Sequence, residues 1–200
     1  MTVEFININQ SEPYKKFLKF YDEAIRSEQK HIEAISISSY DTDLKEVNSR
    51  FVNLKYVNDE NWIFFSNYDS PKSKDFQNHN QIAALIFWDK LNVQIRMKAK
   101  IEKTSNLFSD KHFSQRSKEK NVSAISSQQS KKIDSYEEVI KKYEDVFKDN
   151  SINNVRPSYW GGYSFRPYSI EFWEGKYTRL NKRTNYVFEN NKWVNYILQP

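Results

Sequence analysis

The residues best able to do chemistry in this 200-residue chain are cations and hydroxyls, because thiols are absent and imidazoles are few. Without cysteine, disulfides and thiolate metal sites are excluded, and His31, His79 and His112 lie too far apart for a zinc signature. The three glycines form neither a Rossmann nor a P-loop pattern. Any bound phosphate must therefore be held by Arg, Lys, Ser and helix N-termini, and no metal site is expected.

One such helix N-terminus is predicted near the middle of the chain. Ser70 is of the N-cap type, Pro71 suits the first helical position, and residues 70–78 are typical of a short helix. Its first turn is well suited to an anion.

The composition excludes several classes of protein. The net charge of +5 and the 16% aromatic content are compatible with nucleic-acid binding, but lysines alternate with acids, as in residues 141–145, and no block of five like charges occurs. No apolar run approaches the roughly 20 residues of a membrane span, and residues 1–9 lack the features of a signal peptide. We expect a cytoplasmic protein without a nucleic-acid or membrane partner.

The hydrophobic period changes from helical to strand-like after the first 31 residues. Apolar residues at three- and four-residue steps predict a helix over 12–31, and alternation dominates from residue 32 to about 104. Two hairpins are predicted there: residues 51–57 with 62–65, and residues 82–88 with 93–101. Because the strands follow one another at hairpin spacing, we expect an antiparallel barrel with peripheral helices.

The second half of the chain mixes helices and strands. Helices are predicted over 105–116 and 135–148, and the polar stretch 117–132 between them is predicted to be an ordered loop or a flexible lid. Strands are predicted at 163–165, 169–173 and 178–180, followed by a last hairpin of residues 186–188 and 193–197.

Several segments, in order over residues 32–200, resemble the pyridoxine/pyridoxamine 5′-phosphate oxidases. The most specific are Arg156-Pro-Ser-Tyr-Trp-Gly-Gly-Tyr163, Ser169-Ile-Glu-Phe-Trp-Glu-Gly175 and Arg179-Leu-Asn-Lys-Arg183, and the chain ends in Leu198-Gln-Pro200. Residues 49–55, 64–70 and 127–130, with Lys72 and Gln94, complete the match.

The resemblance implies a mainly β fold, the Greek-key FMN-binding split barrel, and a homodimer with flavin sites between subunits. The predicted organisation is an N-terminal helical segment (1–31) and a split-barrel domain (32–200) whose C-terminal part, from about 156, serves dimerisation and substrate binding. The implied reaction converts pyridoxamine or pyridoxine 5′-phosphate to pyridoxal 5′-phosphate, with O₂ as acceptor and H₂O₂ as product. In such chemistry the flavin carries the redox step, and the protein supplies position and electrostatics.

By this resemblance the FMN-binding positions are Arg50, Lys55, Phe65, Ser66, Lys72, Gln94, Gln129, Ser130, Trp173 and Arg183. Arg50 and Lys72, with Ser66, correspond to positions that hold the FMN phosphate, and two cations with a hydroxyl are what a dianion requires. Without the family, these two cations would be interpreted as ordinary surface charges.

The remaining cofactor positions divide into two groups. Gln94, Trp173 and Arg183 correspond to positions around the flavin ring, where they supply an amide, an indole and a cation. Gln129 and Ser130 correspond to positions that reach the flavin across the dimer.

The substrate-binding positions implied are Lys55, His112, Arg116, Lys120, Arg179 and Asn181. Lys55 and Arg116 would bind the phosphate of the vitamer. Arg179 is the predicted catalytic residue, which holds the pyridine ring over the flavin as planar cation and donor together.

Four positions differ from the family pattern. His112 replaces a tyrosine, Lys120 a serine, Asn181 a histidine, and Pro71 an arginine that helps to bind the FMN phosphate. His112 still supplies a hydrogen-bond donor, whereas Asn181 cannot titrate. Two alternatives therefore stand beside the vitamer oxidase: a flavin oxidase of the same fold with another substrate, such as those of phenazine biosynthesis, and a non-catalytic FMN-binding protein.

Overall fold

Strands that bury alternate side chains make most of this protein. The computed structural model describes residues 2–149 and 155–200 and places ten strands of the described chain in one sheet. They are β1 (Glu4–Ile6), β2 (Ala34–Asp41), β3 (Glu46–Asn53), β4 (Tyr56–Asn58), β5 (Asn61–Asn67), β6 (Gln81–Trp88), β7 (Val93–Lys103), β8 (Trp160–Glu174), β9 (Lys182–Glu189) and β10 (Lys192–Leu198).

The sheet curves into a barrel that is split along one seam. Its central order is β5-β8-β7-β6-β2-β3, with all of these neighbours antiparallel. β3 returns to lie against β5, but no ladder of paired backbone groups joins the two strands. β1 extends the sheet beyond β4 in parallel, and β9 and β10 form a hairpin on β8. The predicted mainly β split barrel with peripheral helices is confirmed.

The core fills the barrel and continues under the first helix. On β6 every second residue is buried, as the alternation predicts. α1 (Glu12–Arg26) adds Phe17, whose ring lies 4.5 Å from Trp62 and 5.9 Å from Trp88, measured between centroids. All three are buried, and burying a side chain of this size contributes about 1.5–3 kcal/mol.

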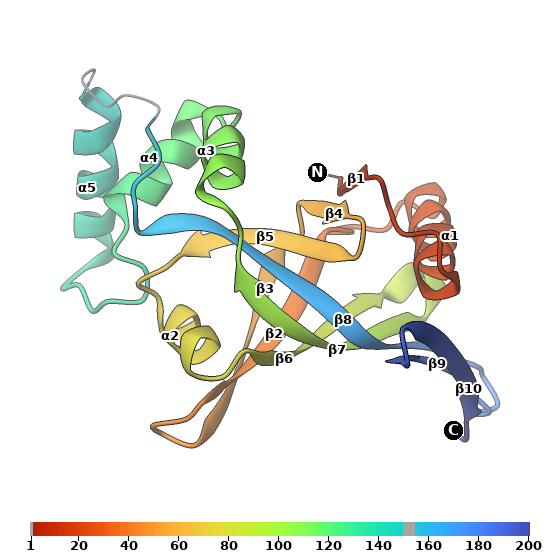
Figure 1. Cartoon of the computed structure of the whole chain (residues 1–200). Helices are drawn as coiled ribbons and strands as arrows, with labels where there is room; N and C mark the ends of the chain where they lie inside the picture. The colour runs from red at the N-terminus through yellow and green to blue at the C-terminus, as the bar shows by residue number, and fades with distance from the viewer. Residues whose placement is uncertain (1, 150–154) are drawn as a thin grey trace.

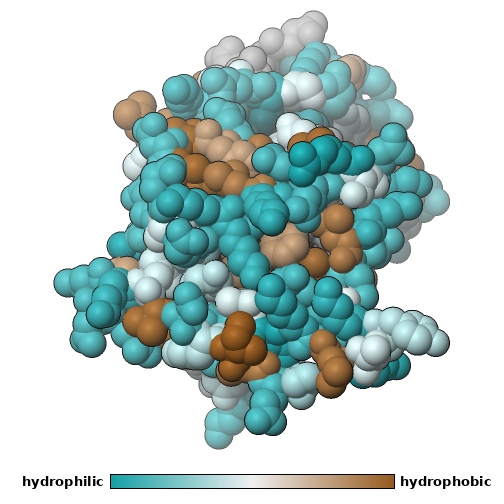
Figure 2. All heavy atoms as spheres, turned by 90° about the vertical axis from the view of Figure 1, so that its right-hand side faces the viewer, coloured by the Kyte–Doolittle hydropathy of each residue, from teal (hydrophilic) through white to brown (hydrophobic). Residues whose placement is uncertain are grey.

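The helices gather at the two ends of the sheet (Figure 1). α3 (Asn106–Ser114), α4 (Lys118–Ser126) and α5 (Tyr136–Lys148) lie together at one end, and α1 lies at the other, near the β9–β10 hairpin. Figure 2 shows the latter end, where apolar side chains are scattered among hydrophilic ones. No helix in the described part of the chain is long and apolar enough to cross a membrane.

Three predicted elements of the first 132 residues need correction. The helix predicted over 12–31 ends at Arg26, where the backbone N–H of Ser27 donates to the carbonyl of Glu23 and the chain turns. The strand predicted over 51–57 is two strands, because β3 pairs with β2 and β4 pairs with β5. The predicted loop 117–132 contains α4, which buries Asn121 and Val122.

The C-terminal strands also differ from the prediction. Residues 163–165 and 169–173 belong to one long strand, β8, whose register against β7 shifts between Lys98 and Ala99. The strand predicted at 178–180 is a loop, in which Arg179 has a left-handed backbone (φ 65°) that a strand cannot contain.

Candidate active site

A cavity of about 740 Å³ opens at the split of the barrel. β3 and β5 form part of its lining, and α2 (Pro71–Asn78), α3, α4 and the start of β8 contribute further residues, together with the segments that join them. This volume falls in the range of about 300–1,000 Å³ that holds small organic ligands. The structure brings ten of the fifteen predicted site residues into this one place: Arg50, Lys55, Phe65, Ser66, Lys72, His112, Arg116, Lys120, Gln129 and Ser130. We call it the cationic cavity, because its described lining has five cationic side chains and no carboxylate.

The α2 side of the cationic cavity carries Lys72 and Arg50. Lys72 is only 7% exposed, and its Nζ donates to the Ser70 hydroxyl at 3.0 Å. Burial, and after it the charge of Arg50, lower the pKa of Lys72 to about 8, although Asp75 opposes them. The Arg50 guanidinium donates to Ser39 at 2.7 Å and lies 3.9 Å from Asp75. A buried cation whose pKa is lowered in this way gains from a bound anion.

α2 begins beside these cations. Ser70 is its N-cap and Pro71 its first residue, as predicted, so this helix N-terminus borders the cationic cavity. The hydroxyl of Ser70 donates to the Asn67 carbonyl at 2.7 Å, which fixes the turn into the helix. Pro71, which stands where the resemblance implied an arginine, thus defines the start of the helix but adds no charge.

Gln129 and Ser130 line the cationic cavity of the subunit to which they belong. The Gln129 side-chain oxygen accepts from the Ser66 hydroxyl at 3.3 Å and from the Asn67 backbone N–H at 3.4 Å. The resemblance assigned these two residues to a flavin across the dimer. Here they stand beside the hydroxyl that was predicted to hold the phosphate in the same subunit.

A second group of cations lies on the α3–α4 side. The Arg116 guanidinium donates to the Lys120 carbonyl at 2.8 Å, while its buried Nη1 has no hydrogen-bond partner within the described residues. Burial lowers the pKa of Arg116 to about 10. The pKa of Lys55 is also lowered, by burial first and by Lys120 and Arg116, with Glu33 opposing. An unpartnered guanidinium N–H next to a cavity is a donor for an incoming anion.

Aromatic rings also line the cavity. Phe65 stacks on His112 with centroids 3.7 Å apart and planes 10° apart, and it lies parallel to Trp160 at 5.3 Å. Arg116 covers the Trp160 ring at 4.3 Å, a cation–π contact. A Cβ at Gly162 would come within 2.5 Å of the Thr104 side chain and 3.1 Å of the Phe65 ring, so the glycine lets both side chains pack against β8.

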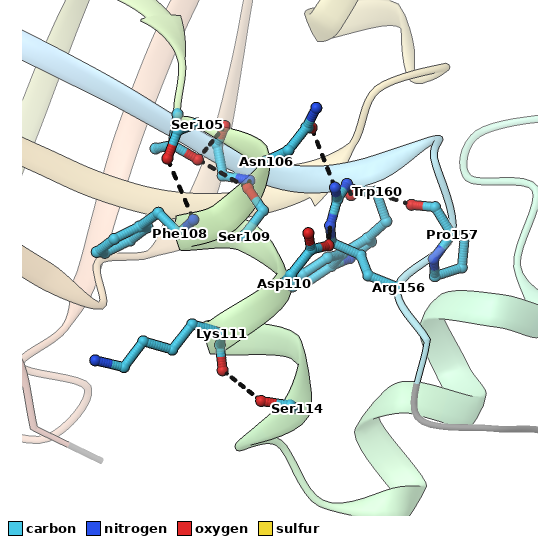
Figure 3. Close-up of polar contacts among 12 residues, drawn as sticks. Ser105, Asn106, Phe108, Ser109, Asp110, Lys111, Ser114, Arg156, Pro157 and Trp160 are labelled. Carbon is cyan, nitrogen blue, oxygen red and sulfur yellow. Dashed lines mark hydrogen bonds and ion pairs between the residues drawn. The ribbon is translucent and has the colours of Figure 1, made fainter.

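Arg156 attaches the start of β8 to α3 (Figure 3). Its guanidinium pairs with Asp110 at 2.6 Å and donates to Asn106 at 3.1 Å and to the Trp160 carbonyl at 2.6 Å. The side chain of Arg156 is 7% exposed. Since α3 carries His112 and β8 carries Trp160, this one residue fixes two groups of the cavity relative to each other.

The two cation groups have different electrostatic neighbours. The pKa of Lys72 responds to Arg50 and Asp75, whereas those of Lys55 and His112 respond to Arg116 and Lys120. Arg50 and Lys72 lie on β3 and α2, whereas Arg116 and Lys120 lie after α3 and on α4, so the lining of the cationic cavity presents cations from two sets of elements.

The predicted flavin-ring residues lie elsewhere, in a row across β7, β8 and β9. Gln94 pairs with Trp173 in the β7–β8 register, and Trp173 pairs with Arg183 in the β8–β9 register. The Gln94 side chain accepts from Arg96 at 2.8 Å, and Arg183 donates to Glu171 at 2.8 Å. This Gln94–Trp173–Arg183 row does not line the cationic cavity of its own chain.

Arg179 and Asn181 occupy the loop between β8 and β9, also outside that cavity. Arg179 is exposed. The Asn181 side-chain oxygen accepts from the Lys176 backbone N–H at 3.0 Å, so the asparagine supports the loop instead of titrating. A side chain at Gly175 would collide with the present position of the Asn92 side chain, where the loop leaves β8.

Sequence reasoning missed three residues that shape the site: Tyr56, Arg156 and Trp160. Arg156 and Trp160 stand in the motif that carried the resemblance, but no role was assigned to them. Tyr56 follows the matched run 49–55 and gave no signal of its own; only the fold brings its hydroxyl to 2.7 Å from His112.

Comparison with solved structures shows the class of fold. PhzG from Burkholderia lata 383, solved in complex with tetrahydrophenazine-1-carboxylic acid, is similar with a TM-score of 0.89 and 22% identity over 95% of this chain and 93% of its own. A pyridoxamine 5′-phosphate oxidase-related, FMN binding protein from Nostoc punctiforme PCC 73102 has a TM-score of 0.75 and 11% identity over 96% and 99%. Both support the split barrel.

Sequence comparison shows the family. Residues 21–148 match the family model "Pyridoxamine 5′-phosphate oxidase", and residues 160–200 match "Pyridoxine 5′-phosphate oxidase C-terminal dimerisation region". The pyridoxine/pyridoxamine 5′-phosphate oxidase of Haemophilus influenzae (strain ATCC 51907 / DSM 11121 / KW20 / Rd) is 34% identical over 94% of this chain and 89% of its own length. That of Actinobacillus succinogenes is 35% identical over 95% and 90%. The chain belongs to the pyridoxamine 5′-phosphate oxidase family, which confirms the family and the enzyme class predicted from the motifs.

Proposed function

We propose that this chain is an FMN-dependent oxidase that converts pyridoxamine 5′-phosphate or pyridoxine 5′-phosphate to pyridoxal 5′-phosphate, with O₂ as acceptor and H₂O₂ as product. The observation that carries the proposal is the pair of separate cation groups in one cavity. A cofactor and a substrate that each bear a phosphate require two such positions. Membership of the family supports the same chemistry.

The residues at α2 fit the phosphate of FMN. Lys72 supplies a buried positive charge and Arg50 a half-buried one, Ser66 supplies a hydroxyl, and the first turn of α2 supplies a favourable dipole. When bound, the flavin supplies the redox chemistry, taking two electrons from C4′ of the vitamer and passing them to O₂. Phe65 and Gln129 complete this part of the cavity.

The residues at α3 and α4 fit the phosphate of the vitamer. Lys55 before β4, Arg116 after α3 and Lys120 on α4 supply charge, and the buried Nη1 of Arg116, which has no hydrogen-bond partner among the described residues, supplies a donor. His112 adds a hydrogen bond in place of the family tyrosine. Together they hold the substrate by its phosphate and leave the pyridine ring to be oriented by other groups.

A second copy of the chain completes the site. The Gln94–Trp173–Arg183 row and Arg179 lie outside the cavity of their own chain, mostly within the segment that matches a dimerisation region. In a homodimer, the row of one protomer closes the cavity of its partner around the flavin ring. Arg179 then lies over the substrate; its left-handed backbone, which costs a non-glycine residue about 1–3 kcal/mol, is consistent with a functional constraint.

Anaerobic bleaching tests the proposal. The purified protein with FMN should be yellow, and pyridoxamine 5′-phosphate should bleach it without O₂; readmitting O₂ should restore the colour and release H₂O₂. Bound FMN that neither vitamer phosphate bleaches would overturn the substrate. Bleaching by another amine or alcohol would then favour a different oxidase of this fold. If none of the tested amines and alcohols led to H₂O₂, a non-catalytic flavoprotein would be favoured. A protein that refuses micromolar FMN would overturn the cofactor.

Replacing Arg179 tests the catalytic assignment. Arg179→Ala should keep its bound FMN and lose most turnover, roughly 100-fold in kcat, because the lost contact acts on the reacting ring. Lys176→Ala, an exposed cation in the same loop, is the matched control. Unchanged turnover of Arg179→Ala at saturating vitamer would remove Arg179 from the mechanism.

A further inference from the structure

Tyr56 does not line the cationic cavity, but it contacts His112, which does. The Tyr56 hydroxyl is 2.7 Å from His112 Nδ1, and the two rings meet edge to face, 5.4 Å apart and at 84°. Nothing in the motifs assigns a role to Tyr56.

His112 is held neutral in one orientation. Phe65 stacks against its face at 3.7 Å, and burial, followed by the charges of Arg116, Lys55 and Lys120, lowers its pKa to about 4. At neutral pH the imidazole therefore carries one proton, on either Nδ1 or Nε2. The nitrogen that Tyr56 does not engage is Nε2, and His112 is one of the residues that line the cavity.

We propose that Tyr56 fixes His112 with its proton on Nε2, so that this nitrogen donates a hydrogen bond to the substrate phosphate. The inference rests on the proposed function, which puts that phosphate between α3 and α4. Tyr56 is then a positioning residue that acts through His112.

Two arguments favour this tautomer. Burial, and after it Glu4, raise the pKa of Tyr56, so its hydroxyl keeps its proton and can donate to Nδ1. With the proton on Nδ1 instead, Nε2 would point a lone pair at a bound anion, and the two would repel each other. The charged groups that face the imidazole, Lys55 before β4, Arg116 after α3 and Lys120 on α4, are all cations that attract such an anion. A neutral donor adds a hydrogen bond there without adding a fourth charge.

The first test observes the tautomer directly by NMR of holoprotein labelled with ¹⁵N in its histidine rings. His112 should hold its proton on Nε2 between about pH 6 and pH 9, and Tyr56→Phe should give a mixture of tautomers. Tyr40→Phe is the matched control, because Tyr40 contacts His79 with ring centroids 5.9 Å apart, outside the cavity. A proton on Nδ1 in the wild type, or an unchanged tautomer in Tyr56→Phe, overturns the inference.

The second test separates binding from chemistry. Tyr56→Phe should raise KM for pyridoxamine 5′-phosphate by the reciprocal of the Nε2–H share that NMR measures in this variant, about twofold for an even mixture, while kcat does not change. In a His112→Gln background, whose amide has no tautomers, Tyr56→Phe should leave KM unchanged. Equal effects in both backgrounds would show that Tyr56 merely supports the fold, and would overturn the inference. If the wild type turns over no vitamer phosphate, the proposed function fails, whereas the NMR result, with inorganic phosphate as the probe, still decides the tautomer.

Discussion

The predicted site has two parts, the cationic cavity and the Gln94–Trp173–Arg183 row. They differ in how far their polar side chains are hydrogen-bonded within the chain. In the cavity, five cations meet no lining carboxylate, and Arg116 keeps a buried N–H without a partner in the described residues. In the row, Gln94 and Arg183 are already bonded to Arg96 and Glu171, which lie 3.4 Å apart.

The difference shows which region depends on a ligand. A buried guanidinium N–H without a partner among the described residues, as at Arg116, costs folding free energy, and a bound phosphate offsets that cost. A row whose polar groups are paired within the chain keeps its shape without a ligand and offers a preformed wall. We therefore expect substitutions in the cavity to act on phosphate binding, and substitutions in the row to act on contacts with the flavin ring.

The largest effect should come from Lys72. Lys72→Met keeps the length of the side chain and removes its charge, so the Kd for FMN should rise at least about 100-fold, since a desolvated charge pair is lost. Riboflavin, which has no phosphate, should bind almost equally to both proteins. Lys74→Met removes an exposed cation from the same helix and should leave both affinities unchanged. Isothermal titration measures all three, and equal FMN affinity in Lys72→Met would contradict the phosphate assignment.

Arg156 should matter next, through stability. Arg156→Ala leaves the buried end of β8 without its donor to the Trp160 carbonyl, and we expect the free energy of unfolding to fall by about 2 kcal/mol. Asp110→Asn, on the half-exposed partner, keeps the shape and should cost clearly less. Urea unfolding measures both. If the two variants were equally stable, the backbone contacts of Arg156 would not hold α3 and β8 together.

Trp173 should give a smaller effect of a different kind. Trp173→Ala should raise the Kd for FMN and the Kd for riboflavin by the same factor, about tenfold, because an aromatic contact with the flavin ring does not involve the phosphate. Tyr136→Ala, an exposed aromatic on α5, is the control. If only the affinity for FMN fell, Trp173 would contact the phosphate, and the assignment of the row to the flavin ring would be wrong.

The smallest effect should be a pH dependence. Because the pKa of Lys72 in the free protein is about 8, the lysine is charged below that pH and FMN binding takes up a proton above it. The Kd for FMN should therefore be roughly constant near pH 7 and about fourfold higher at pH 8.5, and Lys72→Met should abolish the rise. A flat profile in the wild type would mean that another group carries the charge.

Local patterns predicted the elements wherever the chain has one strong periodicity. The 135–148 helix and the 82–88/93–101 hairpin were right, because their apolar faces are unambiguous. The errors fall where tertiary contacts outweigh local preference. Residues 51–57 look like one strand, but the backbone N–H of Leu54 donates to Glu33, just before β2, and that of Lys55 donates to Ile63 of β5. The polar segment 118–126 is helical, and α4 buries its own Asn121 and Val122.

The sequence alone determined which groups could bind the ligands, since a chain with no cysteine and three glycines must use cations, hydroxyls and a helix N-terminus for phosphate. Only the tertiary structure decided how these groups divide. The seam between β3 and β5 collects ten of them, and the β7–β9 register puts Gln94, Trp173 and Arg183 on another surface. The reason is physical: residue type sets what a side chain can bind, whereas burial and neighbours, which arise from strands far apart in the chain, set its charge, its partners and its place.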